Sequence, residues 1–405
     1  MKHRSSITLL FTILFFASLA CSTLIPKPTL PVQVPTQIQP EMIAEAPTQA
    51  PASNPLPVSI SVGGSHACAL LDNGHVRCWG DNSSGQLGNG TYTKHNTATE
   101  VPGLTDIISI SAGGSHTCAV TQTGHVKCWG NNYSGQLGNG TRQTGMVPTE
   151  IPSLTDILTL SAGFEHTCAV SIDGSTKCWG KNLNGRIGEG SAKLFVVSPV
   201  NVAGLESDIL SISASDEHTC ALTSTGNVKC WGRNTEGQLG IGQETNRSKV
   251  PVDVVGIDGK ATALSTGFSN SCVVTNDGQA KCWGWLGVEE LSNTPVAFDG
   301  LGENAKLVAT GSSHVCVVLE SGEVKCMGEN TKGQLGNGSI SDFEAFVTVQ
   351  DLPTDIIGIG ASFDYTCVLA NSGEIFCWGS NTSGQLGNGT AENSSTPVKV
   401  IGINR

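Results

Sequence analysis

The stretch ISVGGSHACALLDNGHVRCWGDNSSGQLGNGT, residues 60–91, decides the fold, because it returns as ISAGGSHTCAVTQTGHVKCWGNNYSGQLGNGT at residues 110–141. Diverged copies of the same unit follow along the chain. A sequence that repeats with such a period builds one supersecondary unit many times, so residues 58–405 are predicted to form a single repeat domain. The first cysteine of each unit recurs 44 to 52 residues apart, at Cys68, Cys118, Cys168, Cys220, Cys272, Cys316 and Cys367.

Each unit alternates short runs of small and β-branched residues with glycine-containing turns, a pattern that predicts about four short strands. One four-stranded sheet cannot bury its faces alone, and a linear stack would leave sheet edges unprotected. Seven sheets arranged radially close on themselves. We therefore expect an all-β fold, a seven-bladed β-propeller of about 50-residue four-stranded repeats.

Two elements of the unit are similar to the repeat of the regulator of chromosome condensation family. They are Gly-x-x-His-(Thr/Ser)-x-x-Leu and Trp-Gly-x-Asn-x-x-Gly-Gln-Leu-Gly-x-Gly. The resemblance covers residues 58–405 and implies a seven-bladed propeller whose N- and C-terminal strands share a blade. Two units depart from the pattern: the fifth reads Trp283-Gly284-Trp285-Leu286 and then lacks the Gly-Gln-Leu-Gly loop, and the third has Arg186 in place of Gln.

The composition agrees with a turn-rich β protein and argues against one class of partner. The chain has 405 residues, of which 50 are glycine, and its formal net charge is −12. Glycine is unfavourable inside helices, so long helices are not expected. Nucleic-acid binding depends on Lys and Arg that neutralise phosphate, and an acidic chain without a basic cluster does not favour it.

The N-terminal segment predicts export. Residues 1–20 resemble a secretory signal, with Lys2 and Arg4 preceding an apolar run over residues 7–16 that is too short for a comfortable membrane span. We expect an exported protein, either a cell membrane lipoprotein facing the extracytoplasmic side or a secreted chain.

Residues 21–57 are predicted to be a tether. Cys21 follows Ser18-Leu19-Ala20, which resembles the lipobox of bacterial lipoproteins, although Ser18 stands where Leu, Val or Ile is usual. Lipidation of Cys21 would also explain the odd cysteine count of 15. The alternative is ordinary signal cleavage that leaves a free thiol. The rest of the segment is rich in Pro, Thr and Gln and is expected to be a disordered spacer.

The fourteen domain cysteines are expected to form disulfides within hairpins. If residues 72–74 form a three-residue loop with Gly74 in the left-handed position, residues 68 and 78 face each other on adjacent strands. Zinc sites need closer cysteine spacing, and free thiols suit a cytosolic protein better than an exported one. Each bridge would contribute about 2 to 3 kcal/mol. The expected pairs are Cys68–Cys78, Cys118–Cys128, Cys168–Cys178, Cys220–Cys230, Cys272–Cys282, Cys316–Cys326 and Cys367–Cys377.

Two further recurring residue types are interpreted as structural. A histidine precedes the first cysteine by two residues in five units, and we expect its ring nitrogens to bond a neighbouring turn rather than a metal. One tryptophan per blade is expected to pack between blades, with Met327 in its place in the sixth unit. The residues are His66, His116, His166, His218 and His314, with Asn270 and Tyr365 in the remaining units, and Trp79, Trp129, Trp179, Trp231, Trp283 and Trp378.

No catalytic or cofactor motif stands out from the repeat background. The Gly-Gln-Leu-Gly loop lacks the Lys-Ser/Thr and the following helix of a phosphate-binding loop. Neither a nucleophile elbow nor a zinc-protease motif is present. The sequence therefore predicts a protein that is not an enzyme and needs no metal or cofactor.

Function in a propeller is expected where the blades differ, on exposed loops. One variable position lies just before the histidine, and neutral drift is the alternative explanation for its variation. A second zone follows the Gly-Asn-Gly-Thr element, around Tyr92 and around Phe343 and Phe346, and we expect it on the opposite rim. The candidate binding face consists of Phe164, Glu165, Asp216, Glu217, Phe268, Phe363 and Asp364.

The function predicted from these features is a non-catalytic binding scaffold. The partner would be another protein or a component of the cell envelope, and the membrane would be reached only through an N-terminal lipid. We expect a monomer. The family resemblance implies two alternatives, an activity like guanine-nucleotide exchange and a secreted inhibitor of the type that blocks β-lactamases.

Overall fold

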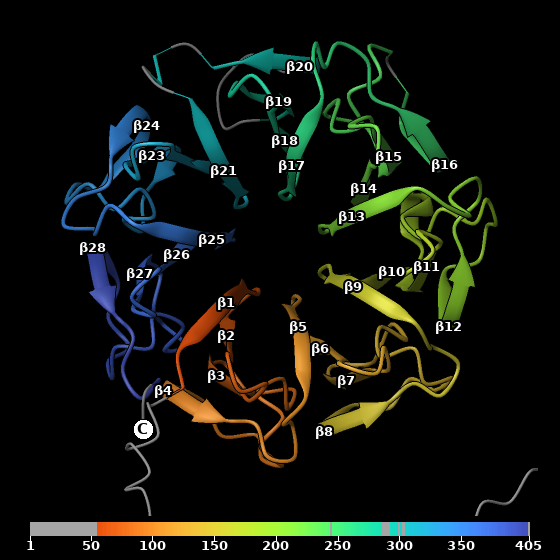
Figure 1. Cartoon of the computed structure of the whole chain (residues 1–405), viewed down its shortest axis with the longest axis horizontal. Coiled ribbons are helices and arrows are strands. Elements are labelled where there is room, and N and C mark those ends of the chain that lie inside the picture. The colour runs from red at the N-terminus through yellow and green to blue at the C-terminus, as the bar shows by residue number, and fades with distance from the viewer. Residues whose placement is uncertain (1–54, 244, 286–291, 299, 302–303, 404–405) are drawn as a thin grey trace, which may run out of the picture. The chain divides into compact units, whose positions relative to one another are not determined.

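The computed structural model describes residues 55–403 except residues 244, 286–291, 299 and 302–303. The predicted signal, Cys21 and nearly all of the predicted spacer lie outside the described residues. The described residues belong to one compact unit, 53–405. It contains seven four-stranded antiparallel sheets arranged around a central axis, so the prediction of a seven-bladed propeller is confirmed (Figure 1).

The first strand of each blade lies next to the axis (Figure 1). These innermost strands are β1 (Pro57–Val62), β5 (Ile107–Ala112), β9 (Ile157–Ala162), β13 (Ile209–Ala214), β17 (Ala261–Thr266), β21 (Ala305–Thr310) and β25 (Ile356–Ser362). The second strands are β2 (His66–Leu71), β6 (His116–Thr121), β10 (His166–Ser171), β14 (His218–Thr223), β18 (Asn270–Thr275), β22 (His314–Leu319) and β26 (Tyr365–Ala370), and every residue in them is buried.

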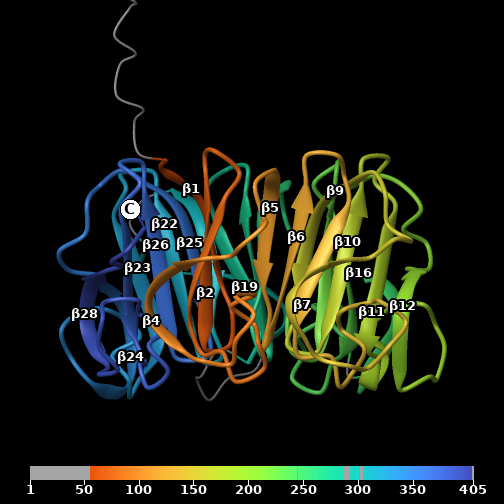
Figure 2. The ribbon, with the colours of Figure 1, turned by 90° about the horizontal axis from the view of Figure 1, so that it is seen from below.

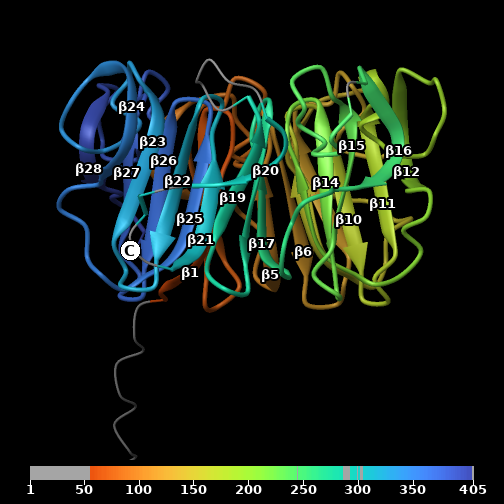
Figure 3. The same ribbon diagram turned by 90° about the horizontal axis from the view of Figure 1, so that it is seen from above.

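The third and fourth strands lie progressively farther from the axis, and loops join the strands at both ends of the ring (Figures 2 and 3). The third strands are β3 (Val76–Gly80), β7 (Val126–Gly130), β11 (Thr176–Lys181), β15 (Val228–Arg233), β19 (Ala280–Gly284), β23 (Val324–Asn330) and β27 (Ile375–Gly379). The outermost are β4 (His95–Glu100), β8 (Gly145–Glu150), β12 (Phe195–Asn201), β16 (Arg247–Asp253), β20 (Ser292–Ala297), β24 (Ser341–Thr348) and β28 (Ser394–Lys399). A short 3-10 helix, η1, spans Leu183–Gly185.

Each cysteine pair joins the second and third strands of one blade. In the first blade Cys68 faces Cys78, with Gly74 at a φ of 78° in the hairpin turn between them. All seven predicted pairs are disulfide-bonded, each with a sequence separation of 10. A hairpin of this length sets the register by itself, which is why the sequence was sufficient to predict the bridges.

The expectation that the terminal strands share a blade is wrong. The first blade consists entirely of β1–β4 and the last entirely of β25–β28. Because each unit already supplies four strands, the ring closes through contacts between complete blades. The Tyr365 hydroxyl donates to the carbonyl oxygens of Gly63 at 2.9 Å and His66 at 2.7 Å, and Arg77 Nη1 donates to the carbonyl oxygen of Gly402.

The core lies between blades, and the tryptophans pack there as predicted. Trp129 is fully buried, and its Nε1 donates to the carbonyl oxygen of Gln86 in the preceding blade at 2.9 Å. The repeat tryptophans of five other blades make the equivalent bond at 2.8 to 2.9 Å, with Arg186 in place of Gln as the acceptor for Trp231. The Gln of the Gly-Gln-Leu-Gly loop therefore presents its backbone carbonyl to the next blade, and the loop joins neighbouring blades.

Candidate binding face at one end of the central axis

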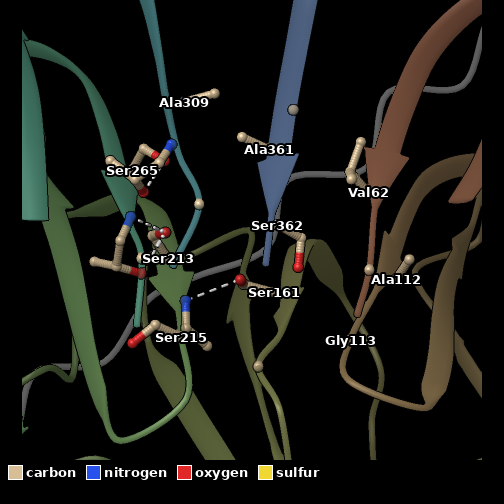
Figure 4. Close-up of a pocket in the computed structure, with 18 of the residues that line it drawn as sticks. Val62, Ala112, Gly113, Ser161, Ser213, Ser215, Ser265, Ala309, Ala361 and Ser362 are labelled. Carbon is tan, nitrogen blue, oxygen red and sulfur yellow. Dashed lines mark hydrogen bonds between the residues drawn. The ribbon is translucent and has the colours of Figure 1, made fainter. Parts of the chain in front are cut away.

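Seven turns join the innermost strand of each blade to its second strand, and we call them the mouth loops. They occupy residues 63–65, 113–115, 163–165, 215–217, 267–269, 311–313 and 363–364. Together with the innermost strands they line a cavity on the axis (Figure 4). All seven residues of the predicted binding face belong to mouth loops, and Phe164, Asp216, Phe268 and Phe363 line the cavity itself.

Two of the predicted aromatic residues meet, although two blades separate them along the ring. The rings of Phe164 in the third blade and Phe363 in the seventh make an edge-to-face contact, with centroids 5.6 Å apart. Gly64 and Gly114 leave the space for them: a Cβ on Gly114 would lie 2.3 Å from the Phe164 ring. The small residues in the first two blades and the aromatic residues in the third and seventh are therefore complementary, and Phe164 still keeps 38% of its surface exposed.

Further apolar side chains extend this end of the ring. Phe268 is 39% exposed, and Trp285, whose backbone N–H donates to the carbonyl oxygen of Ser269 at 2.9 Å, is 37% exposed. Tyr133, in the loop after β7, is 67% exposed. Trp285 was not among the predicted binding residues, although it departs from the repeat. An unshared aromatic residue in a unit that has lost its loop was the available signal.

Most of the predicted acids form ion pairs with Arg or Lys side chains of the same protein. Arg186, only 1% exposed, lies 3.7 Å from the Glu217 carboxylate and 4.0 Å from that of Asp216, and it donates to the Asp216 carbonyl oxygen. Glu217 also pairs with Arg233. This explains why the third unit has Arg where the others have Gln: the acids of the next blade neutralise it. Sequence reasoning listed both halves of this cluster without joining them.

The remaining predicted acids differ in their partners. Glu165 pairs with Lys181 and accepts a hydrogen bond from Ser134 Oγ at 3.0 Å. Asp364 makes no ion pair with any described residue, and burial, together with the nearby charge of Glu329, raises its pKa. Burial also raises the pKa of Asp216, against the opposing effect of Arg186. The unneutralised negative charge of the face therefore centres on the seventh blade.

The recurring histidines have the structural role expected of them, but Nε2 bonds a hydroxyl in the second strand of the next blade rather than a turn. His66 Nε2 lies 2.9 Å from Thr117 Oγ1 of the next blade, and that hydroxyl lies 2.8 Å from the Gln86 carbonyl oxygen. Because the threonine proton goes to the carbonyl, the histidine must donate through Nε2. Burial lowers the pKa of His66 to about 4 and that of His116 to about 3.

The two exceptions to this pattern fit it. Asn270 stands in place of histidine in the fifth blade, and the next blade has Val315 where a hydroxyl would be needed. Tyr365 stands there in the seventh blade, and the following position in the ring is Ala67. The histidine and its hydroxyl partner are thus lost together, a signal that a comparison of successive units could have found.

The second variable zone does not lie on the opposite rim. Gly80, at the end of β3, pairs with His66, at the start of β2, so the loop that follows β3 emerges at the same end as the mouth loops. Tyr92 lies in that loop, and Phe343 lies near the start of β24, whose Ser341 pairs with Asn330 at the corresponding end of β23. Phe343 is partly exposed, whereas Phe346 packs against Phe298, with ring centroids 4.9 Å apart.

Metal-binding clusters and membrane-spanning helices were also considered for the part of the chain that the structure describes. In the described part of the chain, no three or more His, Cys, Asp or Glu side chains are grouped so that they could hold a metal ion. No helix among these residues is both long enough and apolar enough to traverse a bilayer.

Three family profiles match four segments of the chain. The profile of the RCC1-like domain matches residues 32–299, more than half of the sequence. Profiles of the regulator of chromosome condensation (RCC1) repeat match residues 305–334, 356–385 and 372–405.

Curated relatives match about half of this chain. The ultraviolet-B receptor UVR8 of Arabidopsis thaliana is 30% identical over 221 residues, which are 52% of this chain and 50% of the receptor. The probable E3 ubiquitin-protein ligase HERC3 of Homo sapiens is 32% identical over 195 residues, which are 48% of this chain and 14% of the ligase. The chain thus spans half of the receptor and a small part of the ligase.

Solved structures share the fold. Prp20p of Saccharomyces cerevisiae, described with its binding to Gsp1p and histones, superposes with a TM-score of 0.71 at 19% identity, covering 86% of this chain and 88% of that one. Human WBSCR16 gives a TM-score of 0.70 at 20% identity, covering 79% of this chain and 87% of that one.

Proposed function

This chain belongs to the RCC1-like domain family, and from that premise we propose that it is a non-catalytic scaffold that binds another protein through its mouth loops. The observation that carries the proposal is the group of partly exposed aromatic side chains, Phe164, Phe268 and Phe363, at one end of the axis. Aromatic residues in partly enclosed positions are the anchors that dominate protein interfaces. Prp20p, which shares the fold, is described as binding Gsp1p and histones.

The backbone at Phe363 supports the same conclusion. This residue has a φ of 34°, in the left-handed region that bulky side chains rarely adopt. Strain of this kind costs roughly 1 to 3 kcal/mol and clusters at binding sites. Its ring contacts that of Phe164. The nearby acids would affect the rate and specificity of association with the partner more than the affinity for it.

A paired set of variants tests the binding face. The variant Phe164→Ser/Phe268→Ser/Phe363→Ser removes three partly exposed apolar residues from the mouth loops. The matched control, Ile108→Ser/Leu158→Ser/Leu210→Ser, removes three exposed apolar residues from the far ends of the innermost strands. Affinity capture from envelope and culture-medium proteins should give one stoichiometric partner that the control retains and the mouth-loop variant loses by at least about tenfold.

The proposal fails if the folded mouth-loop variant binds this partner as tightly as the wild type. Melting curves of all three proteins establish that each is folded. A partner lost only by the control variant would place the contact at the opposite end of the ring.

We further propose that the chain is exported and tethered through Cys21, with residues 1–20 as the signal, residues 21–57 as lipid anchor and spacer, and residues 58–405 as the binding domain. The seven disulfides support this proposal, because such bonds persist in oxidising compartments. A protein anchored in this way could meet protein partners or envelope polymers outside the cytoplasm.

Labelling with a radioactive fatty acid tests the tether. The wild type should be labelled and recovered with membranes, whereas Cys21→Ser should be unlabelled and released. Equal release of both proteins into the medium would contradict lipidation without affecting the proposed binding face.

A further inference from the structure

The axis of the propeller holds a cavity whose mouth is formed by residues of the proposed protein contact, and its deeper lining plays no part in that contact. It has a volume of about 310 Å³ and is lined by the innermost strands below the mouth loops (Figure 4). This volume is at the lower end of the range for small-molecule sites.

One side of the cavity carries serine hydroxyls with unused bonding capacity. Three of these serines accept a backbone N–H of the next blade through Oγ at 2.9 Å; the pairs are Ser61 with Ala112, Ser111 with Ala162 and Ser161 with Ala214. Among the residues described, none accepts the hydroxyl proton of these three serines. Each hydroxyl therefore retains one donor and one acceptor site.

The equivalent position is also a serine in the fourth and fifth blades, but not in the sixth and seventh. Ser213 and Ser265 bond hydroxyls of the following blades, Thr266 at 2.8 Å and Thr310 at 2.9 Å. The sixth and seventh blades have no hydroxyl here, because Ala309 and Gly360 take the serine position.

The sixth and seventh blades contribute small apolar side chains to the cavity, beside the hydroxyls of Thr310 and Ser362. The side chain of Val62 occupies the space beside Gly360, where a Cβ would lie 2.7 Å from Val62 Cγ2. Ala309 and Ala361 also line the cavity, and Figure 4 shows Ala309 near Ser265 and Ala361 next to Ser362. The cavity thus offers both hydrogen bonds and van der Waals contact.

Charge narrows the class of ligand. The lining contains no Lys or Arg, and its single acid is Asp216 at the mouth. An anion in the cavity would contact no cationic side chain of the lining, and the net charge of the protein is −12. A ligand hydroxyl, in contrast, can accept from a serine O–H and donate to the remaining lone pair of another serine.

We propose that the axial cavity binds one small uncharged polyhydroxyl molecule of the size of a monosaccharide. Its hydroxyls bond Ser61, Ser111 and Ser161, its C–H surface contacts Ala309 and Ala361, and the aromatic rings of the mouth loops cover it. The aromatic rings at its mouth are shared with the proposed protein contact, whereas the serines below them are not.

Saturation-transfer NMR and titration with glucose, N-acetylglucosamine and myo-inositol on the full chain test this site. At least one of these should bind the wild type with a dissociation constant of about 1 mM or lower. Ser111→Ala/Ser161→Ala should weaken it at least about tenfold, by removing two hydroxyl contacts. The sixth blade already has Ala309 at this position. Titration with a short soluble oligomer of the bound sugar then shows whether the site accepts only the free sugar or also the end of a polymer.

A second variant keeps the test informative if the serine variant does not fold. Ala361→Leu adds bulk to the cavity wall without removing a hydrogen-bonding side chain, and it should abolish binding. Its control, Ala203→Leu, changes an exposed loop residue and should leave binding unchanged. The proposal is overturned if no sugar or polyol binds, if Ala361→Leu binds normally, or if acetate or phosphate binds in their place.

Discussion

At the scale of single residues, the buried histidines show how one hydrogen bond fixes a charge state. His116 is completely buried, and its Nε2 lies 2.9 Å from Thr167 Oγ1 of the next blade. Because the threonine donates to the Gln136 carbonyl oxygen, protonation of His116 would add a buried charge with no acceptor for its second proton. Burial accordingly lowers the pKa of His116 to about 3, and that of His218 to about 3.

These pKa values predict loss of stability in acid. The unfolded chain binds protons as the pH falls below about 6.5, whereas the folded chain does not until about pH 3 to 4. The neutral buried histidines therefore make their full contribution to the free energy of unfolding above pH 6.5. Below that pH the contribution declines by about 1.4 kcal/mol per pH unit for each histidine. The free energy of unfolding, measured by urea titration between pH 7 and 5, should fall less steeply with decreasing pH for His116→Asn than for the wild type. The control His95→Asn removes no buried imidazole, and an identical slope in all three proteins would refute this assignment.

At the scale of the element, the Gly-Gln-Leu-Gly loop and the tryptophan of the next blade act as one joint. The sixth blade has Met327 in place of tryptophan, and the fifth blade before it lacks the Gly-Gln-Leu-Gly sequence. Without that loop the indole N–H would lose its carbonyl acceptor, which makes methionine the better residue. The aromatic pair Phe298 and Phe346 packs beside Met327 in the same core cluster.

Because Gly88 lies close to the Trp129 indole, a methyl group added there should destabilise the protein more than one added at an open glycine. Gly88 has a φ of 69°, and a Cβ there would lie 2.6 Å from Trp129 Nε1. Gly103 has a φ of 77° and no atom within 4 Å of its Cβ position, so it serves as the control. Gly103→Ala should lower the free energy of unfolding by about 1 kcal/mol through backbone strain alone. Gly88→Ala should cost a further 1 to 3 kcal/mol, roughly, by overpacking. Equal losses in denaturant titrations would contradict the joint.

At the scale of the whole molecule, the ring is closed by side chains and loops rather than by a shared blade. Tyr365 is fully buried, and its hydroxyl reaches two carbonyl oxygens of the first blade, about 300 residues away in sequence. The closing junction lacks the histidine and threonine pair, so this tyrosine replaces it.

Removing that hydroxyl should loosen the closing junction. Tyr365→Phe leaves the Gly63 carbonyl oxygen without its tyrosine donor and should lower the free energy of unfolding by about 1 to 3 kcal/mol. Hydrogen exchange should quicken first in the first and seventh blades. Tyr133→Phe, at a largely exposed position, is the control and should change neither quantity. Uniform exchange in all blades would show that closure does not depend on this residue.

Much of the fold was predictable from the sequence because its determinants are local. The repeat spacing set the number of blades, and a ten-residue hairpin with Gly74 at its turn set the cysteine pairing. The predicted binding residues did fall on one face, since they share one position in every unit.

Only the tertiary structure decided how separate blades meet. The contact between Phe164 and Phe363, the burial of Arg186 against acids of the next blade and the closure through Tyr365 depend on residues that the ring brings together from different repeats. The loop around Tyr92 belongs to the same end of the ring as the mouth loops for a similar reason, because alternating strand direction decides where each loop emerges. Periodicity describes one unit, whereas these contacts arise from the differences between units and from the curvature that closes seven of them into a ring.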